Sequence, residues 1–325
     1  MKTFDDAVLD DNNPIVSISL MGKIVFIAIL SVFVSMCLVI LYDTEYGFML
    51  FIGVPLSIGF TAGFIMKNPT KSIFHIFNKV LLIFIVITLL LILCKVEGGI
   101  CIIMIAVPLY ILLLFSYALG HIIRVHYNIT QKPFLFSLIL INPFFAGIDL
   151  SMKDGFTQHI EDKLTINADT SIVWNVLTQP VQYAEPTNFF FKYGVNYPKN
   201  MQVTAANDSL YLVCNLRNGD AALKITSLKE DSLLRFEPRQ AILPIKELTV
   251  YKNINTPHSH DAYFKINYGE FMIKQLGENK TELYATTELT HHLRPYFYWN
   301  LWNRYIIHQM HKNVLQTIKQ RVEAN

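Results

Sequence analysis

The chain changes its pattern of apolar and polar positions at about residue 150. Before that point apolar residues come in long runs with few charges, and after it they alternate with polar residues over short segments. Long apolar runs are typical of membrane-spanning helices, whereas alternation with a period of two is typical of strands with one buried face. We therefore predict an α-helical transmembrane bundle followed by a separate α+β domain.

The first half of the chain predicts a bundle of four spans over residues 23–132, after a polar tail over residues 1–22. Each span is close to the ~20 residues that cross a bilayer core of ~30 Å. The predicted spans are residues 24–42, 46–66, 80–94 with an extension back to about 73, and 100–120. The small pair Gly59 and Gly63 has the GxxxG spacing that lets another helix approach closely, and we expect packing within the chain rather than dimerisation.

Residues 134–148, inside a linker over residues 133–158, are harder to assign. This stretch is short for a span and is interrupted by Asn142-Pro143. We expect it to lie at the membrane interface or against the bundle, with a fifth span as the alternative.

Basic residues predict the orientation of the spans. The loop at 43–45 has no Lys or Arg and the loop at 95–99 has one, whereas basic residues gather between the second and third spans and after the fourth. Basic loops stay in the cytoplasm, so four spans place both termini on the cytoplasmic side of the inner membrane. Membrane lipids are then expected partners.

The second half predicts strands closed by a long helix. Alternation marks strands at residues 159–167, 212–216, 223–225, 234–236, 248–250, 263–274 and 283–289. In the first of these we expect an irregularity between Ile160 and Leu164, and in the sixth a bulge at Gly269 that shifts the phase after Tyr268. Leu283, Ala285, Thr287 and Leu289 form the inward face of the last strand. Residues 295–322 repeat apolar positions at helical spacing, which predicts a long C-terminal helix.

These elements carry a family resemblance over residues 159–323. Ile166-Asn-Ala168 with Val173-Trp174 and Leu177 resembles the opening of the SRPBCC superfamily of START and polyketide cyclase-like proteins. The closing helix resembles a bacterial subgroup of polyketide cyclases or dehydrases at Tyr298-Trp299, Ile306-Ile307, His311, Val314-Leu315, Ile318-Lys319 and Glu323. The resemblance implies a helix-grip domain over residues 159–325, in which a curved antiparallel sheet wraps around the helix and leaves an apolar cavity.

Composition and charge exclude several functions. Apolar residues make up 52% and charged residues 16% of the chain, which is too apolar for an ordinary soluble protein. The net charge of +2 and the lack of a basic cluster give no reason to expect a nucleic-acid partner. The four cysteines lack metal-ligand spacing, and neither His291 with His292 nor His308 with His311 is completed by a third ligand. We therefore expect no metal and no cofactor.

Aromatic and aliphatic side chains of the closing helix and the sheet are the candidate ligand-binding residues. They are Trp299, Trp302, Tyr305, Ile306, Met310, Phe264, Ile266, Tyr268, Phe236 and Leu223. We predict a protein that binds an apolar small molecule or lipid, as carrier or sensor. No catalytic residue is assigned.

Two alternatives stay open. One is a cyclase- or dehydratase-like enzyme that uses Tyr305, His311 or Glu270, the last turned inward by the bulge. The other is an interaction module with a filled core. Arg235 is expected on the solvent face of an edge strand.

Overall fold

The computed structural model describes residues 47–65, 73–93, 99–127, 141–152, 154–206, 209–240, 242 and 264–324. The chain forms two compact units, one containing residues 48–87 and 107–151 and the other containing residues 88–106 and 152–325. The predicted span at 24–42 and the predicted strand at 248–250 lie outside the described residues.

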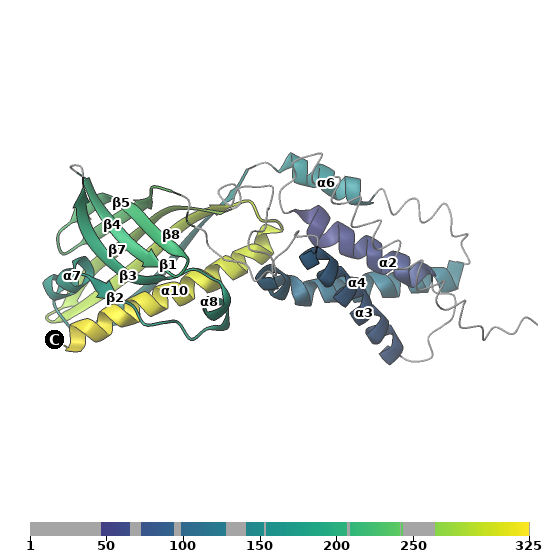
Figure 1. Cartoon of the computed structure of the whole chain (residues 1–325), viewed down its shortest axis with the longest axis horizontal. Coiled ribbons are helices and arrows are strands. Elements are labelled where there is room, and N and C mark those ends of the chain that lie inside the picture. The colour runs from purple at the N-terminus through teal and green to yellow at the C-terminus, as the bar shows by residue number, and fades with distance from the viewer. Residues whose placement is uncertain are drawn as a thin grey trace, which may run out of the picture. The chain divides into compact units, whose positions relative to one another are not determined.

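The first unit is helical (Figure 1). A π-helical segment η1 (Met49–Gly53) continues into α2 (Val54–Ile65), and α3 (Ile73–Leu93), α4 (Gly99–Tyr127) and α6 (Ile141–Ser151) follow. Among the described helices two have apolar segments long enough to cross a membrane, Ile76–Leu93 and Gly99–His126, and Met49–Phe64 is a shorter apolar helix. Length and composition alone identify these helices, so the four-span arrangement stays a prediction.

Glycines let α2 and α4 approach closely. A Cβ atom on Gly59 would lie 2.8 Å from the Leu113 carbonyl oxygen, and one on Gly63 would lie 2.8 Å from the Tyr117 carbonyl carbon. Gly120 on α4 faces Phe60 of α2 in the same way, at 3.0 Å. Any side chain at these three positions would overlap the backbone of the opposite helix. The predicted use of Gly59 and Gly63 in packing within the chain is confirmed.

Helix α6 contains residues 141–148 of the ambiguous stretch. Its 11 residues extend about 16 Å, roughly half the ~30 Å of a bilayer core. The carboxylate of Asp149 on α6 accepts hydrogen bonds from the backbone N–H groups of Phe48 and Met49, at 2.8 and 2.9 Å, where the η1–α2 helix begins. Within the stretch, Asn142 Oδ1 accepts a hydrogen bond from the Ser57 hydroxyl of α2 at 3.4 Å. The described part of the stretch therefore packs against the bundle, which was one of the two expectations. Residues 134–140 lie outside the described residues.

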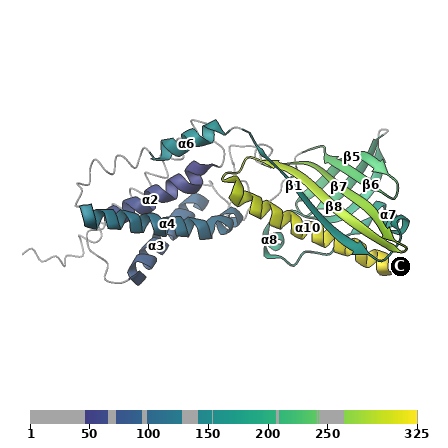
Figure 2. The same ribbon diagram turned by 180° about the vertical axis from the view of Figure 1, so that it is seen from behind.

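The second unit is a curved antiparallel sheet with a long helix along one face (Figures 1 and 2). The strands are β1 (Phe156–Ile166), β2 (Val181–Gln182), β3 (Pro198–Ala206), β4 (Ser209–Leu216), β5 (Gly219–Lys229), β6 (Leu233–Pro238), β7 (Phe264–Gly277) and β8 (Lys280–His291). The sheet order in the described residues is β1-β8-β7-β6-β5-β4-β3-β2. The helices of this unit are α7 (Thr170–Thr178), α8 (Phe189–Tyr193) and α10 (Tyr296–Ala324).

The core of this unit lies between the sheet and the C-terminal half of α10. Leu315 and Ile318 of α10 are fully or almost fully buried with Val173 and Leu177 of α7 and with Leu212 of β4. Burying apolar area at roughly 25 cal/mol per Å² is the main force that holds the helix in the sheet. The predicted helix-grip architecture of the second half is confirmed.

Three strand assignments differ from the sequence prediction. Strand β2 was not predicted, because its two residues are too few to show an alternating pattern. Strand β3 was not predicted, because beyond Met201 its side chains are mostly exposed and carry little apolar alternation. Strand β6, which carries Arg235, was predicted at an edge but pairs with β5 and β7 on its two sides. Arg235 does lie on the outer face of the sheet, where its Nε donates to Glu270 Oε2 at 2.6 Å.

The bulge in β7 lies at Asn267, two residues before the predicted position. The pairing with β8 passes from Ile266–Leu289 directly to Tyr268–Glu288, so Asn267 has no cross-strand partner, and Gly269 pairs regularly with Thr287. A bulge shifts every following side chain to the opposite face. Tyr268 therefore lies on the outer face, and Gly269 lies on the inner face against the ring of Phe236.

Candidate functional site

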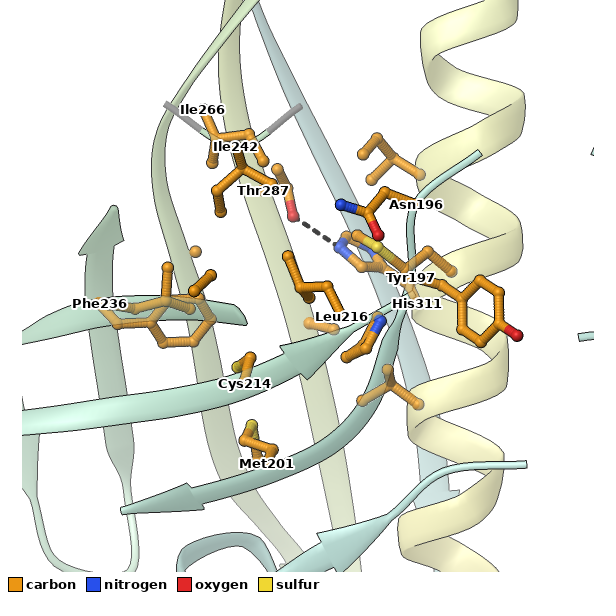
Figure 3. A pocket seen from close by; sticks show the side chains of 18 of the residues that line it. Asn196, Tyr197, Met201, Cys214, Leu216, Phe236, Ile242, Ile266, Thr287 and His311 are labelled. Carbon is orange, nitrogen blue, oxygen red and sulfur yellow. Dashed lines mark hydrogen bonds between the residues drawn. The ribbon is translucent and has the colours of Figure 1, made fainter. Parts of the chain in front are cut away.

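A cavity of about 160 Å³ lies inside the second unit, between the concave face of the sheet and α10. Figure 3 shows side chains from the sheet and from α10 surrounding it. Its wall is almost entirely apolar, with Met201, Leu212, Cys214, Leu223 and Phe236 from the sheet and Met310 from the helix. The core of the domain is therefore not filled.

Six of the ten candidate binding residues line this cavity. They are Leu223, Phe236, Phe264, Ile266, Ile306 and Met310. Their side chains come from β5, β6, β7 and α10, so the curvature of the sheet and the helix period bring them together. A molecule inside the cavity would therefore be within reach of residues from four separate elements.

The other four candidates lie elsewhere. Tyr268 faces outward, and the Arg235 guanidinium lies over its ring at 4.5 Å. Its prediction as a cavity residue was wrong because the bulge falls before it rather than after it.

Trp302 and Tyr305 face α8 rather than the cavity. The ring of Trp302 meets Phe190 of α8 edge to face at 5.1 Å, and the Tyr305 hydroxyl accepts a hydrogen bond from Asn188 at 2.5 Å. Trp299 is buried in the first turn of α10, where its indole N–H donates to the Arg294 carbonyl at 3.2 Å. The sequence prediction gave all three to the sheet because the apolar period alone does not distinguish the sheet side of α10 from its other buried positions, such as those that α8 covers at Trp302 and Tyr305.

A hydrogen-bonded chain of three side chains begins at the cavity wall and continues behind it. Thr287 of β8 and His311 of α10 both line the cavity, and Thr287 Oγ1 lies 2.8 Å from His311 Nε2 (Figure 3). On the other side of the imidazole, His311 Nδ1 lies 2.8 Å from Oδ2 of Asp162 on β1. His311 and Thr287 are both buried, at 5% and 6% exposure.

Asp162 occupies this position because β1 is regular. Its pairing with β8 runs from Phe156 to Ile166 without a register shift, so Asp162 faces inward between Ile160 and Leu164. The predicted irregularity in this strand is therefore wrong: the interruption of its apolar pattern is an inward-facing carboxylate. The signal in the sequence is a charged residue at an inward-facing position of the strand, and the prediction did not use it.

The charge of Asp162 fixes the direction of the hydrogen bond from His311. Burial raises the pKa of Asp162, but hydrogen bonds and charge from His311 and His308 outweigh burial, and the pKa lies below its ordinary value. An ionised carboxylate only accepts hydrogen bonds, so His311 Nδ1 carries a proton and donates it to Asp162. Nε2 then accepts from the Thr287 hydroxyl in a neutral imidazole and donates to Thr287 Oγ1 in a protonated one.

His308 also forms a hydrogen bond with Asp162. Its Nδ1 donates to Asp162 Oδ1, while His311 uses Oδ2 of the same carboxylate. The two imidazoles thus bind two different oxygens rather than converging on one point. Among the described residues no group of three or more His, Cys, Asp or Glu side chains is arranged to hold a metal ion.

Other reactive side chains near the cavity are unsuited to catalysis at neutral pH. Burial raises the pKa of the Cys214 thiol to about 12, so it stays protonated and is a poor nucleophile. Burial also raises the pKa of Tyr183, whose hydroxyl lies 3.5 Å from Met201 Sδ. The Glu270 carboxylate is paired with Arg235 on the outer face, so the prediction that a bulge turns it inward is wrong. Of the three residues considered for catalysis, His311 is the one whose side chain reaches the cavity.

No protein-family model matches the chain, and no curated protein matches it either. Solved structures similar to this chain include norcoclaurine synthase from Thalictrum flavum in complex with dopamine and hydroxybenzaldehyde, at 10% identity and a TM-score of 0.34 over 54% of this chain and 92% of that one. Zhui aromatase/cyclase from Streptomyces sp. R1128 has 12% identity and a TM-score of 0.32, with 52% and 94% covered. A START superfamily protein from Mycobacterium smegmatis has 12% identity and a TM-score of 0.31, with 51% and 97% covered.

Proposed function

We propose that this protein is a membrane-anchored binding protein whose helix-grip domain holds a small apolar molecule, as carrier or sensor. The observation that carries this proposal is the cavity of about 160 Å³, with an apolar wall from both the sheet and α10. A cavity of ~150 Å³ lined by aliphatic and aromatic side chains stays dry and accepts benzene. The ligand we propose is therefore about the size of one ring, and a whole lipid would require the wall to move.

The membrane part of the proposal rests on the surface of α3 and α4. Large apolar side chains along both helices are exposed, at 40 to 69% of their area. They are Phe74, Phe77, Leu81, Leu82, Ile85, Leu89 and Leu93 on α3, and Ile103, Val107, Ile111, Phe115, Leu119, Ile122 and Val125 on α4. A contiguous apolar surface of this kind is unfavourable in water and suits a lipid environment. The basic segments between the predicted spans support a cytoplasmic location for both termini.

A second candidate function is a cyclase- or dehydratase-like enzyme. The Thr287–His311–Asp162 chain favours it, because a histidine oriented by a carboxylate is a common general base. A second acid or base with its side chain directed into the cavity is not found among the described residues, so binding remains the first candidate. The third reading, an interaction module with a filled core, fits poorly with the cavity.

Native mass spectrometry of the full chain in phosphatidylcholine/phosphatidylglycerol nanodiscs tests the binding proposal. We expect a bound small molecule on the protein as purified, or uptake of added 4-fluorotoluene. The variant Ala285→Leu places extra volume at a residue of the cavity wall and should abolish uptake. Ala206→Leu makes the same substitution on an exposed part of β3 and should leave uptake unchanged. An unmodified protein that carries nothing and takes up nothing contradicts the proposal.

A further inference from the structure

We infer that the Thr287–His311–Asp162 chain is a binding site for one neutral hydroxyl group, so that the ligand is an apolar alcohol or phenol. This inference rests on the proposed binding function and adds the chemical class of the ligand. It follows from which polar groups face the cavity, from the hydrogen bonds that already engage them and from the space beside them.

The first step concerns which polar side chains of the wall have capacity left for a ligand. Tyr183 is directed at Met201 Sδ, and the Asn196 side-chain oxygen accepts from the backbone N–H of Asn218 at 3.2 Å. Glu270 is held by Arg235 on the outer face. The Tyr197 ring extends away from the cavity in Figure 3, whereas Thr287 and His311 are joined by a hydrogen bond and both line the cavity. Thr287 Oγ1 is therefore a polar atom of the wall that a ligand can meet.

The second step concerns the protons. Asp162 accepts the proton on His311 Nδ1, and His311 Nε2 shares one hydrogen bond with Thr287 Oγ1. If Nε2 accepts in this bond, Thr287 Oγ1 has a lone pair left for a ligand. If Nε2 is protonated and donates, the hydroxyl proton of Thr287 is left instead.

The third step compares ligand classes. A ligand hydroxyl both donates and accepts, so it satisfies Thr287 Oγ1 whichever way the bond to His311 runs. A ketone or ester only accepts, so it fits only one of the two arrangements. A carboxylate would bring a second negative charge into a buried site that already holds the Asp162 carboxylate, which is unfavourable without a cation. A pure hydrocarbon fits the wall but leaves the Thr287 hydroxyl without a hydrogen-bond partner in the cavity.

The fourth step is size. The volume of about 160 Å³ matches a single ring with one small substituent. In such a ligand the ring meets Phe236, Leu223 and Met310, and the hydroxyl meets Thr287. Placing the recognised group on rigid elements, β8 and α10, fixes its position without a mobile loop.

The test compares 4-fluorophenol with 4-fluorotoluene, which differ by a hydroxyl in place of a methyl group. Fluorine NMR titration of the full chain in nanodiscs gives a dissociation constant for each probe, and protein-free nanodiscs correct for partition into lipid. The measured quantity is the ratio of the two constants, compared between variants, so that any remaining lipid effect cancels.

Thr287→Val replaces the hydroxyl by a methyl of similar shape and should reduce the preference for 4-fluorophenol by about tenfold, the scale of one net hydrogen bond. Thr287→Ser retains the hydroxyl and should retain the preference. Thr290→Val makes the same change further along β8 on the outer face, where Thr290 meets Asn267 and Thr157, and should also retain it.

The outcomes separate the two proposals. If 4-fluorotoluene binds but Thr287→Val leaves the ratio unchanged, the hydroxyl site is wrong and the binding function stands. If neither probe binds the unmodified protein, both proposals are overturned. A tenfold change in Thr287→Val alone supports both.

Discussion

Replacing Gly269 by alanine should disturb the cavity through Phe236. Gly269 lies on the inner face of β7, and a Cβ atom there would lie 2.6 Å from Cζ of the Phe236 ring and still closer to Cε2. Carbon atoms pack at ~3.5–4.0 Å, so the ring must retreat by at least about 1 Å. Phe236 lines the cavity and packs on Phe271 with ring centroids 6.0 Å apart, so the ring has room to move mainly into the cavity.

The expected cost is that of overpacking a core, about 1–3 kcal/mol. At ~2–4 °C per kcal/mol for a domain of this size, the melting temperature should fall by about 2–12 °C. Uptake of 4-fluorotoluene should weaken at the same time, because the displaced ring occupies ligand space. Thermal unfolding followed by tryptophan fluorescence, with fluorine NMR of the probe, measures both effects on one sample.

Gly277 provides a matched control on the same strand. A Cβ atom on Gly277 meets nothing within 4 Å, so Gly277→Ala should be neutral or stabilise by about 0.4–1 kcal/mol through the unfolded state. Phe236→Leu removes the ring that the added methyl group would strike, so the double variant should lose less stability than the sum of the two single variants. If Gly269→Ala behaves like Gly277→Ala in both stability and uptake, the account of the close contact is incorrect.

Two further predictions concern Asp162 and the membrane. The pKa of Asp162 is lower in the folded than in the unfolded protein, so its contribution to stability is present above the unfolded value near ~3.9 and is lost as pH falls through the folded value. The stability difference between the unmodified protein and Asp162→Asn, from urea unfolding in nanodiscs, should therefore shrink below about pH 4; a difference that grows in acid would show that Asp162 is not held ionised. For the orientation, a C-terminal green fluorescent protein fusion should fluoresce and a C-terminal alkaline phosphatase fusion should be inactive, since basic loops stay cytoplasmic. The opposite pair of results would place the C-terminal domain outside.

Local patterns in the sequence determined most of the fold. The apolar period of residues 295–322 predicted α10, and alternation predicted the inward face of β8, including Thr287. Both patterns are local, because a helix repeats its faces every 3.6 residues and a strand every two. The spacing of Gly59 and Gly63 likewise predicted a close helix contact, and α4 supplies it.

The candidate site was only partly predictable, because it depends on contacts between distant segments. The position of the bulge decided that Gly269 rather than Tyr268 faces inward, and pairing with β8 sets that position. Helix α8 decided which aromatic residues of α10 are covered, since Trp302 and Tyr305 meet Phe190 and Asn188.

The Thr287–His311–Asp162 chain shows most clearly what the sequence determined and what the tertiary structure decided. The sequence by itself placed Thr287 on the inner face and His311 on the closing helix, but it predicted an irregularity where Asp162 faces inward. Only the tertiary structure decided that these three residues, which lie up to 149 positions apart, form one hydrogen-bonded chain. Side-chain phase is fixed by the local backbone, whereas hydrogen bonds across a core depend on strand register and on where the helix crosses the sheet.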